Sequence, residues 1–339
     1  MTTMNDVAKR ANVALSTVSY AINGTRPITP ETRQRVLQAM DDLGYRPHAL
    51  ARGLASKHSR ILALLFPTIE RGLGLTELDF FTGAAAAARE NGYHLVLWSA
   101  DGNDSKELQE LAQQGLADGV ILMEVHLNDE RVALLRRMNF PFSMMGQCWK
   151  PEKTNFADID FEQTVRETIQ FLHDLGHTTI GYINQSQEVY DHGYGPAVRT
   201  HNAFEAITQE FGLRGRARFC HANPLAGYET CRELIATEPD LTAVVVMNDR
   251  AVPGVMRAIT DRGWSIPADF SLVSIVSSER MAEMMNPPLT TMDPPSAEMA
   301  RLAVELLIEQ LEGHQRETAQ VLLPCRLIAR GSSARAREV

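Results

Sequence analysis

The chain has 339 residues, about twice the length of a typical domain of ~150 residues, so more than one folding unit is expected. Its hydrophobic fraction of 44% and charged fraction of 22% are those of a globular protein and exclude a disordered or a small disulfide-stapled chain. The net charge of −9 would argue against nucleic acid as a partner if it were spread evenly.

The chain is expected to stay in the cytoplasm and to have no membrane partner. Its first residues lack the basic and apolar regions of a secretory signal, and the apolar runs 61–66 and 243–247 are far shorter than the ~20 residues of a membrane span. The cysteines form no C-x-x-C pair and are interpreted as reduced core thiols: Cys148, Cys220, Cys231 and Cys325.

The charge is divided unevenly along the chain. Residues 1–60 carry nine Lys or Arg and four Asp or Glu, a net charge of +5. Residues 61–339 carry the other 24 basic and 38 acidic residues, a net charge of −14. A basic N-terminal segment indicates contact with nucleic acid, and an acidic body limits non-specific contact with it.

The basic segment is predicted to form three short helices. The first covers residues 4–11 behind an N-cap at Thr3, the second covers 14–22, and the third covers 30–43 behind an N-cap at Thr29. Two short helices joined by about three residues and packed by a third indicate a helix-turn-helix, in which the second helix enters the major groove. Spacing alone fits an ordinary all-α packing module equally well.

The residues of this segment decide between the two interpretations. Its informative strings are Asp6-Val7-Ala8, Val13, Ser16-Thr17-Val18-Ser19, Asn23-Gly24, Thr32-Arg33-Gln34-Arg35-Val36, Leu43-Gly44-Tyr45-Arg46-Pro47 and Ala51-Arg52-Gly53-Leu54. In this order, and over nearly all of the first 60 residues, they closely resemble the DNA-binding head and hinge of the lactose repressor (LacI/GalR) family.

The resemblance implies a role for each matching position. Positions that match contacts to base edges are Leu15, Ser16 and Tyr20. Positions that match phosphate contacts, which set the register without reading sequence, are Thr17, Ser19, Asn23 and Thr32. Residues 49–56 match a hinge helix that orders only on DNA, with Ala51 and Leu54 in the minor groove and Leu54 as the wedge between base steps; plain hinge packing is the alternative for Leu54. His48 departs from the asparagine that is usual in relatives, so a hinge contact there has little support.

From Ile61 onward, apolar strands alternate with helices in two series, which predicts an α/β fold of βαβ units with parallel sheets. The first series has strands 61–66, 94–98, 119–123 and 140–145 and helices 81–91, 105–114 and 129–138. The second begins near Asp160 and has helices 163–175, 199–211, 225–237 and 250–262 and strands 179–183, 217–220, 243–247 and 271–276. A helix 296–312 and strands 319–323 and 326–329 are expected to cross back between the two halves. Two doubly wound subdomains that face each other form a cleft, in which ligands bind at the carboxyl ends of the strands.

Further strings resemble the regulatory core of the same family, which is similar to the sugar-binding periplasmic proteins; they lie at 175–183, 248–251, 263–271, 287–291 and 327–332. The expected domains are a helix-turn-helix head at 1–47, a hinge and linker at 48–60, and an effector-binding core at 61–335. Within the core, the N-subdomain is expected at about 61–158 and 288–318, and the C-subdomain at about 159–287 and 319–332.

Three polar residues are the main effector-binding candidates. Arg199 is expected to open a helix after the loop 185–197 and matches the family's effector-contacting arginine; a guanidinium there could bond two neighbouring hydroxyls, and a surface arginine is the alternative. Asn248 and Asp249 follow a strand and match the family's paired polar contact, with helix capping as the alternative for Asp249.

The other effector-binding candidates are aromatic residues and residues near strand ends. Phe80 and Phe81 match an aromatic pair that stacks on a ring, and Trp149 is a further stacking candidate, although core packing is favoured for both Trp98 and Trp149. Residues near expected strand ends or loops are Glu124, Gln147, Asp160 and Tyr190. Where relatives carry an aspartate, this chain has Val276, which leaves a more apolar or hydroxyl-lined wall.

No catalytic, cofactor or metal site is expected. His177 has no second ligand at i+3 or i+4, Cys220-His221 stands alone, and no P-loop, G-x-S-x-G or dinucleotide motif occurs. The apolar faces of the first core helices, at 84–88, Leu111 and Leu116, are interpreted as a homodimer interface. The tail after Ser332 has no leucine heptad, so no tetramerising coiled coil is expected.

These observations predict a homodimeric repressor of carbohydrate-utilisation genes that binds a near-palindromic double-stranded DNA operator and is released by a small sugar. A purine, nucleoside or phosphosugar effector and a co-repressed response are the alternatives within this class. A free solute-binding protein would have no use for residues 1–60, and an enzyme would need a catalytic constellation that the sequence lacks.

Overall fold

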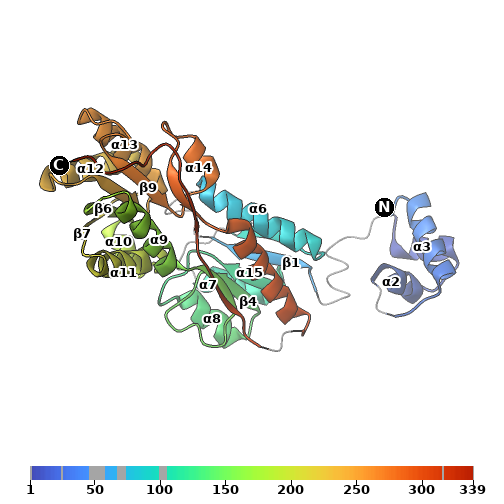
Figure 1. Cartoon of the computed structure of the whole chain (residues 1–339). Helices are drawn as coiled ribbons and strands as arrows, with labels where there is room; N and C mark the ends of the chain where they lie inside the picture. Colours follow the sequence, from blue (N-terminus) through green and yellow to red (C-terminus); the bar gives the residue numbers. More distant parts are fainter. Residues whose placement is uncertain are drawn as a thin grey trace.

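The computed structural model describes residues 2–23, 26–45, 58–66, 74–98, 105–314 and 317–338. Three helices form the N-terminal head (Figure 1): α1 (Met4–Ala11), α2 (Leu15–Asn23) and α3 (Pro30–Asp42). Thr3 and Asp6 form a reciprocal capping box on α1, and the Thr29 hydroxyl caps α3. The predicted hinge helix, with Ala51 and Leu54, lies outside the described residues.

The head has its own small core. Val7, Val18 and Val36, one from each helix, have no exposed surface. Ala21 is also buried, so α2 packs on α1 and α3 through the face that carries Val18 and Ala21.

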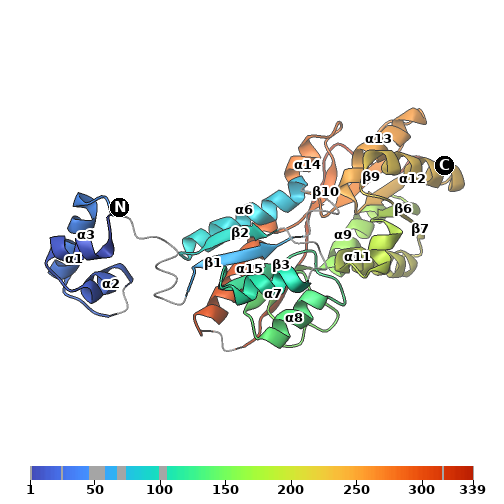
Figure 2. The ribbon, with the colours of Figure 1, turned by 180° about the vertical axis from the view of Figure 1, so that it is seen from behind.

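The first sheet of the core has six strands in the order β11-β5-β4-β3-β1-β2, and every pair in it is parallel. Its strands are β1 (Ile61–Leu65), β2 (His94–Trp98), β3 (Gly119–Leu122), β4 (Phe142–Met145), β5 (Phe156–Ile159) and β11 (Gln320–Leu323). Its helices are α6 (Leu75–Glu90), α7 (Ser105–Gln113), α8 (Glu130–Met138) and α15 (Ser296–Leu311). Helices α6 and α15 pack together on one face, and α7 and α8 pack together on the other (Figure 2).

The second sheet has the order β12-β10-β9-β8-β6-β7, parallel except for the β10–β12 pair. Its strands are β6 (Thr179–Asn184), β7 (Arg214–Phe219), β8 (Ala243–Val246), β9 (Ser271–Ile275), β10 (Thr290–Asp293) and β12 (Arg326–Ile328). Its helices are α9 (Phe161–Asp174), α10 (Gln187–Asp191), α11 (Gly195–Glu210), α12 (Pro224–Thr237), the 3-10 turn η1 (Asp249–Ala251), α13 (Val252–Asp261) and α14 (Glu279–Glu283). The predicted α/β architecture with two doubly wound parallel sheets is confirmed.

The chain crosses between the sheets later than expected. Strand β10 pairs with β9 in the second sheet, and β11 pairs with β5 in the first. The last two crossings therefore lie between β10 and α15 and between β11 and β12, each one strand beyond the expected boundaries at 288 and 319. The final strands have only three or four residues each, too few for their apolar pattern to assign them to a sheet.

The apolar helix faces interpreted as a dimer interface are largely part of the subunit's own core, which corrects that prediction. Ala84, Ala87, Ala88 and Leu111 are buried in the core of the first subdomain, whereas Ala85 and Leu116 are exposed, Leu116 at 43%. Two neighbouring exposed apolar residues of this subdomain, Val96 and Leu97, lie on edge strand β2. Among the described residues, no helix is long and apolar enough to cross a membrane.

Candidate ligand cleft and nucleic-acid interface

Helix α2 presents the predicted DNA-contacting residues on the side away from the head's core. Leu15 is 44% exposed at the start of the helix and Ser16 is exposed beside it. Thr17, Ser19 and Tyr20 are partly exposed, and Arg26 lies over the Tyr20 ring at 5.4 Å from its centroid. An exposed leucine at a helix N-terminus has no packing role in the head, but it suits contact with the methyl group of a thymine.

The two remaining head candidates are placed differently. Thr32 lies in the first turn of α3, where its hydroxyl accepts a hydrogen bond from the Thr29 hydroxyl at 2.9 Å. A helix N-terminus suits a phosphate because its amide groups point outward. Asn23 is the last residue of α2, but its side chain lies outside the described residues.

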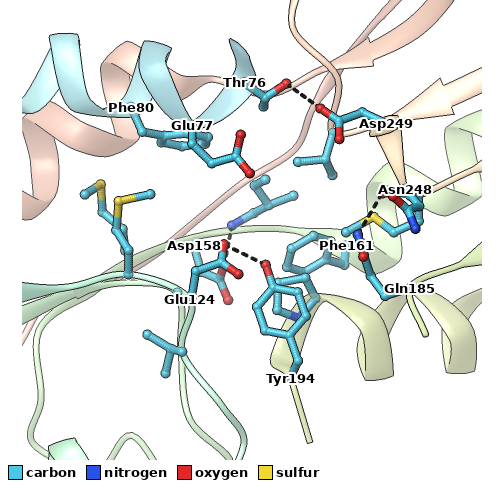
Figure 3. Close-up of a pocket in the computed structure, with 18 of the residues that line it drawn as sticks. Thr76, Glu77, Phe80, Glu124, Asp158, Phe161, Gln185, Tyr194, Asn248 and Asp249 are labelled. Atoms are coloured by element: carbon cyan, nitrogen blue, oxygen red, sulfur yellow. Dashed lines mark hydrogen bonds between the residues drawn. The ribbon is translucent and has the colours of Figure 1, made fainter. Parts of the chain in front are cut away.

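A cleft with an empty volume of about 840 Å³, its open mouth included, lies between the two subdomains (Figure 3). It is lined by residues that follow β1, β3, β4, β6, β8 and β9, as expected for parallel sheets. Its polar lining residues are Thr76, Glu77, Glu124, Asp158, Gln185, Tyr194, Asn248, Asp249 and Arg250, and its apolar lining includes Phe80, Phe161, Met123, Met145, Met247 and Val276. Such a volume suits a small organic ligand.

Glu77 extends from the first turn of α6 into the cleft. Its Oε1 pairs with an Arg250 guanidinium nitrogen at 3.2 Å, and its Oε2 is buried with no hydrogen-bond partner among the described residues. Burial, followed by the nearby carboxylates of Asp249 and Glu124, raises the pKa of Glu77 to about 7, whereas Arg250 opposes the shift.

Asp249 and Asn248 both line the cleft, at the end of β8. Asp249 accepts a hydrogen bond from the Thr76 hydroxyl at 3.4 Å, and burial raises its pKa. The Asn248 amide nitrogen donates to the Cys220 carbonyl at 3.0 Å, so this side chain also orients the cleft wall. No side chain caps η1 or α13, so Asp249 is not a helix cap.

Arg199 lies in the second turn of α11 and not at its start, because the helix begins at Gly195, four residues earlier than expected. Its guanidinium donates to Asp158 at 3.0 Å and to the backbone carbonyl of Gln147 at 2.7 Å. Asp158 lines the cleft, whereas Arg199 lies behind it. Burial raises the pKa of Asp158 to about 7, and Arg199 opposes the shift. Arg199 is therefore an inter-subdomain link and not a surface arginine.

The other candidates divide into residues that line the cleft and residues that do not. Phe80 and Glu124 line it, and Glu124 accepts a hydrogen bond from the Tyr194 hydroxyl at 2.9 Å. Phe81 packs edge-on against Phe66 with ring centroids 5.2 Å apart. The remaining candidates lie outside the lining: Gln147 contributes its carbonyl to Arg199, Trp149 is 68% exposed, Asp160 caps α9, and Tyr190 packs on His201 and Phe219.

Two non-glycine residues of the lining adopt left-handed backbone conformations. Glu124 has φ 52° and Val276 has φ 57°, an unusual conformation for a β-branched residue. Val276 itself lines the cleft, whereas the hydroxyl groups of Ser274 and Ser277 lie outside the lining and hydrogen-bond each other. Such strain is concentrated at functional sites.

Contacts join the two subdomains on both sides of the cleft. On one side, the Ser278 amide donates to the Thr76 hydroxyl at 3.2 Å and Arg280 pairs with Asp79 at 3.5 Å. On the other side, the Leu127 amide donates to the Gly193 carbonyl at 2.7 Å. Polar contacts thus bridge the two subdomains beside the cleft.

Residues 3–48 match the family model described as bacterial regulatory proteins, lacI family, and residues 169–333 match a periplasmic binding protein-like domain. Catabolite control protein A of Priestia megaterium is 29% identical over 98% of this chain and 99% of its own length. The transcriptional regulator AscG of Escherichia coli (strain K12) is 29% identical over 92% of this chain and 93% of its own.

Solved structures are similar over nearly the whole chain. The lac repressor dimer bound to operator and the anti-inducer ONPF matches with a TM-score of 0.83 at 22% identity, covering 98% of this chain and 99% of the repressor. A complex of the transcriptional regulator CelR with cellobiose matches with a TM-score of 0.71 at 24% identity, covering 98% of this chain and 100% of CelR.

Proposed function

Because this chain belongs to the lacI family of bacterial regulatory proteins, a family of DNA-binding transcriptional regulators, we propose that it represses carbohydrate-utilisation genes and is released from its operator by a small sugar. The observation that carries the proposal is the combination, in one chain, of an exposed polar face on α2 with a cleft between two subdomains. The first reads DNA, and the second senses a ligand.

The proposed operator contacts are those of α2 and the start of α3. Leu15, Ser16 and Tyr20 read base edges, while Thr17, Ser19, Asn23 and Thr32 contact phosphates. A head of about 45 residues is too small to bind tightly alone, so the proposed active form is a homodimer on a near-palindromic site, acting in the cytoplasm. The exposed edge strand β2, with Val96 and Leu97, supports pairing with a second copy.

The effector is proposed to bind among the carboxylate and amide groups of the cleft. Hydroxyl groups of a sugar suit acceptors such as Asp249 and Glu77, and Phe80 offers an aromatic face to the ring. A purine is the second candidate because Phe80 and Phe161 both line the cleft and suit a flat ring. A phosphosugar is disfavoured, since the two arginines at the cleft already pair with carboxylates.

Release is proposed to follow from a change in cleft closure. The effector contacts both subdomains, changes their relative angle, shifts the two halves of the dimer and separates the hinge segments. An effector shifts this equilibrium only by its differential affinity for the two states, typically ~1–3 kcal/mol of coupling.

Fluorescence anisotropy of the full-length protein on DNA from upstream of its own gene tests the DNA-binding proposal. Tight binding to a palindrome and at least tenfold weaker binding to a scrambled duplex are expected, with affinity falling steeply between about 50 and 200 mM salt. Equal binding to both duplexes would refute the proposal.

A further inference from the structure

The cleft contains more negative than positive charge. Four carboxylates surround it, from α6, from the segment after β3, from β5 and from η1: Glu77, Glu124, Asp158 and Asp249. In Figure 3 they lie around one common space. Two guanidinium groups accompany them, Arg250 in the lining and Arg199 behind it.

Both guanidinium groups are engaged by carboxylates. Arg199 pairs with Asp158 at 3.0 Å and Arg250 pairs with Glu77 at 3.2 Å. With four carboxylates against two guanidinium groups, the formal charge of the fully ionised cleft is −2. An anionic ligand would add to this imbalance, whereas a cation would remove it.

The ionisation behaviour of the cleft agrees with a shortage of positive charge. The pKa of Glu77 is raised to about 7, first by burial and then by the carboxylates of Asp249 and Glu124. Burial also raises the pKa of Asp249. A positive charge placed among these three groups would stabilise their ionised forms.

The geometry provides acceptors for such a charge. Glu77 Oε2 is buried, faces the cleft and has no donor among the described residues. An ammonium group carries three N–H donors and no acceptor, which suits an all-acceptor site. Around this acidic region, Phe80, Phe161 and Val276 form apolar walls that suit the carbon faces of a sugar ring.

We propose that the effector is an amino sugar, whose protonated amine lies among Glu77, Glu124 and Asp249 while its ring packs against Phe80 and Phe161. The inference rests on the proposed function, because it specifies the ligand class of the same cleft. The proposal predicts that the cleft binds amino sugars more tightly than neutral sugars or phosphosugars with the same ring.

Isothermal titration of the full-length protein against matched sets tests this inference. The probes are glucosamine, galactosamine, mannosamine and deacetylated chitobiose, each compared with its neutral counterpart, its N-acetyl form and its 6-phosphate. At least one amine is expected to bind tenfold or more tightly than every matched neutral or anionic sugar. Binding of a neutral sugar as tightly as its amine, or no binding by any amine, would overturn the inference.

Two variants test the role of the carboxylates, with one matched control. Asp249→Asn and Glu124→Gln should each reduce the ratio of amine to neutral-sugar affinity by about tenfold, which corresponds to ~1.4 kcal/mol. Glu229→Gln removes the same charge from an exposed position on α12 and should leave the ratio unchanged. If both cleft variants keep the wild-type ratio of amine to neutral-sugar affinity, the proposed binding position of the amine is wrong.

Operator binding by the same preparations distinguishes failure of the amino-sugar proposal from failure of the DNA-binding proposal. A variant that has lost its fold would also lose its preference for the palindrome, so only variants that retain it are compared; chemical denaturation of each confirms that its core is folded. If the wild-type protein distinguishes the palindrome but prefers no amine, the amino-sugar inference fails and the DNA-binding proposal stands.

Discussion

Arg199 of α11 and Asp158 of β5 form an ion pair of 3.0 Å that joins the two subdomains at the cleft. The side chain of Asp158 is 3% exposed and that of Arg199 is 22% exposed. The pair therefore lies largely out of solvent, where removing one partner costs more than removing both.

Replacement of Arg199 by Met should lower the free energy of unfolding by about 3–5 kcal/mol, because it leaves a buried carboxylate without its partner. The loss should be larger at pH 8 than at pH 5.5, since a protonated Asp158 needs no cationic partner, and removing Arg199 raises the pKa of this carboxyl further. Urea denaturation measures both values. The double variant Arg199→Met with Asp158→Asn should recover most of the loss, and a single variant within about 1 kcal/mol of wild type would contradict this account.

Substitutions on α2 should separate base reading from phosphate contact. Leu15→Ala and Tyr20→Ala are expected to weaken operator binding by about 1–3 kcal/mol and to leave binding to scrambled DNA unchanged. The ratio of operator affinity to scrambled-DNA affinity should therefore fall. Thr17→Ala should weaken binding to both duplexes by similar factors. Anisotropy titrations on the two duplexes measure the ratio, and a uniform loss for Leu15→Ala would remove it from the base-reading set.

The buried His177 should make folding sensitive to acid. Its ring hydrogen-bonds Thr242, Ser271 and the Ala334 carbonyl, at 2.8, 3.1 and 3.1 Å, and burial lowers its pKa below the ordinary 6.5. Because the unfolded chain then takes up a proton more readily than the folded one, this stability is present above about pH 6.5 and is lost as the pH falls through the folded-state pKa.

Measurements of the free energy of unfolding between about pH 7.5 and pH 5 test whether stability falls with pH as expected. His177→Gln should flatten part of the acid loss, while the same change at the more exposed His173, on α9, should not. Equal pH profiles for wild type and His177→Gln would show that other groups cause the acid sensitivity.

Helices α12 and α13 approach each other too closely for side chains at their contact. A Cβ at Gly254 would lie 1.7 Å from the Pro224 carbonyl oxygen, and one at Gly227 would lie 2.2 Å from that of Ala251. Both neighbours are backbone atoms, so Gly254→Ala should cost about 3 kcal/mol or more in thermal or urea unfolding. Gly92→Ala offers a contrast, since its Cβ would meet nothing within 4 Å and only the positive φ of 75° opposes it, at about 1–2 kcal/mol.

The sequence predicted the fold closely, and the cleft in part. The alternating strands and helices could be predicted because the hydrophobic period of each kind of element is set by its local geometry. Strand β5 was missed because it has only four residues and contains the charged Asp158. The role of Asp158 as the partner of Arg199 was therefore missed as well. Only the fold reveals that this charge is buried.

Glu77 was missed for a different reason. Helix α6 begins at Leu75, but its N-cap is Gly74, with no side-chain hydrogen bond, so the sequence marked the start at Phe81. Gln185 and Tyr194 were missed because they lie in connections between strand and helix, where no periodicity applies. Asn248 and Asp249 were found because they lie just past the buried strand β8 and match a polar pair of the family that the chain resembles.

Helix α15 and strand β11 belong to the first subdomain but lie near the C-terminus, so they are among the last parts of the chain to be synthesised. Residues 320–323 supply the edge strand beside β5, and α15 covers the first sheet from residue 296 onward. A nascent chain therefore cannot complete its first subdomain until nearly all of the second has left the ribosome. A stop codon anywhere before residue 320 would leave both halves without partners, so partial products of this gene should be cleared by proteolysis and should not persist as DNA-bound fragments with a working sensor.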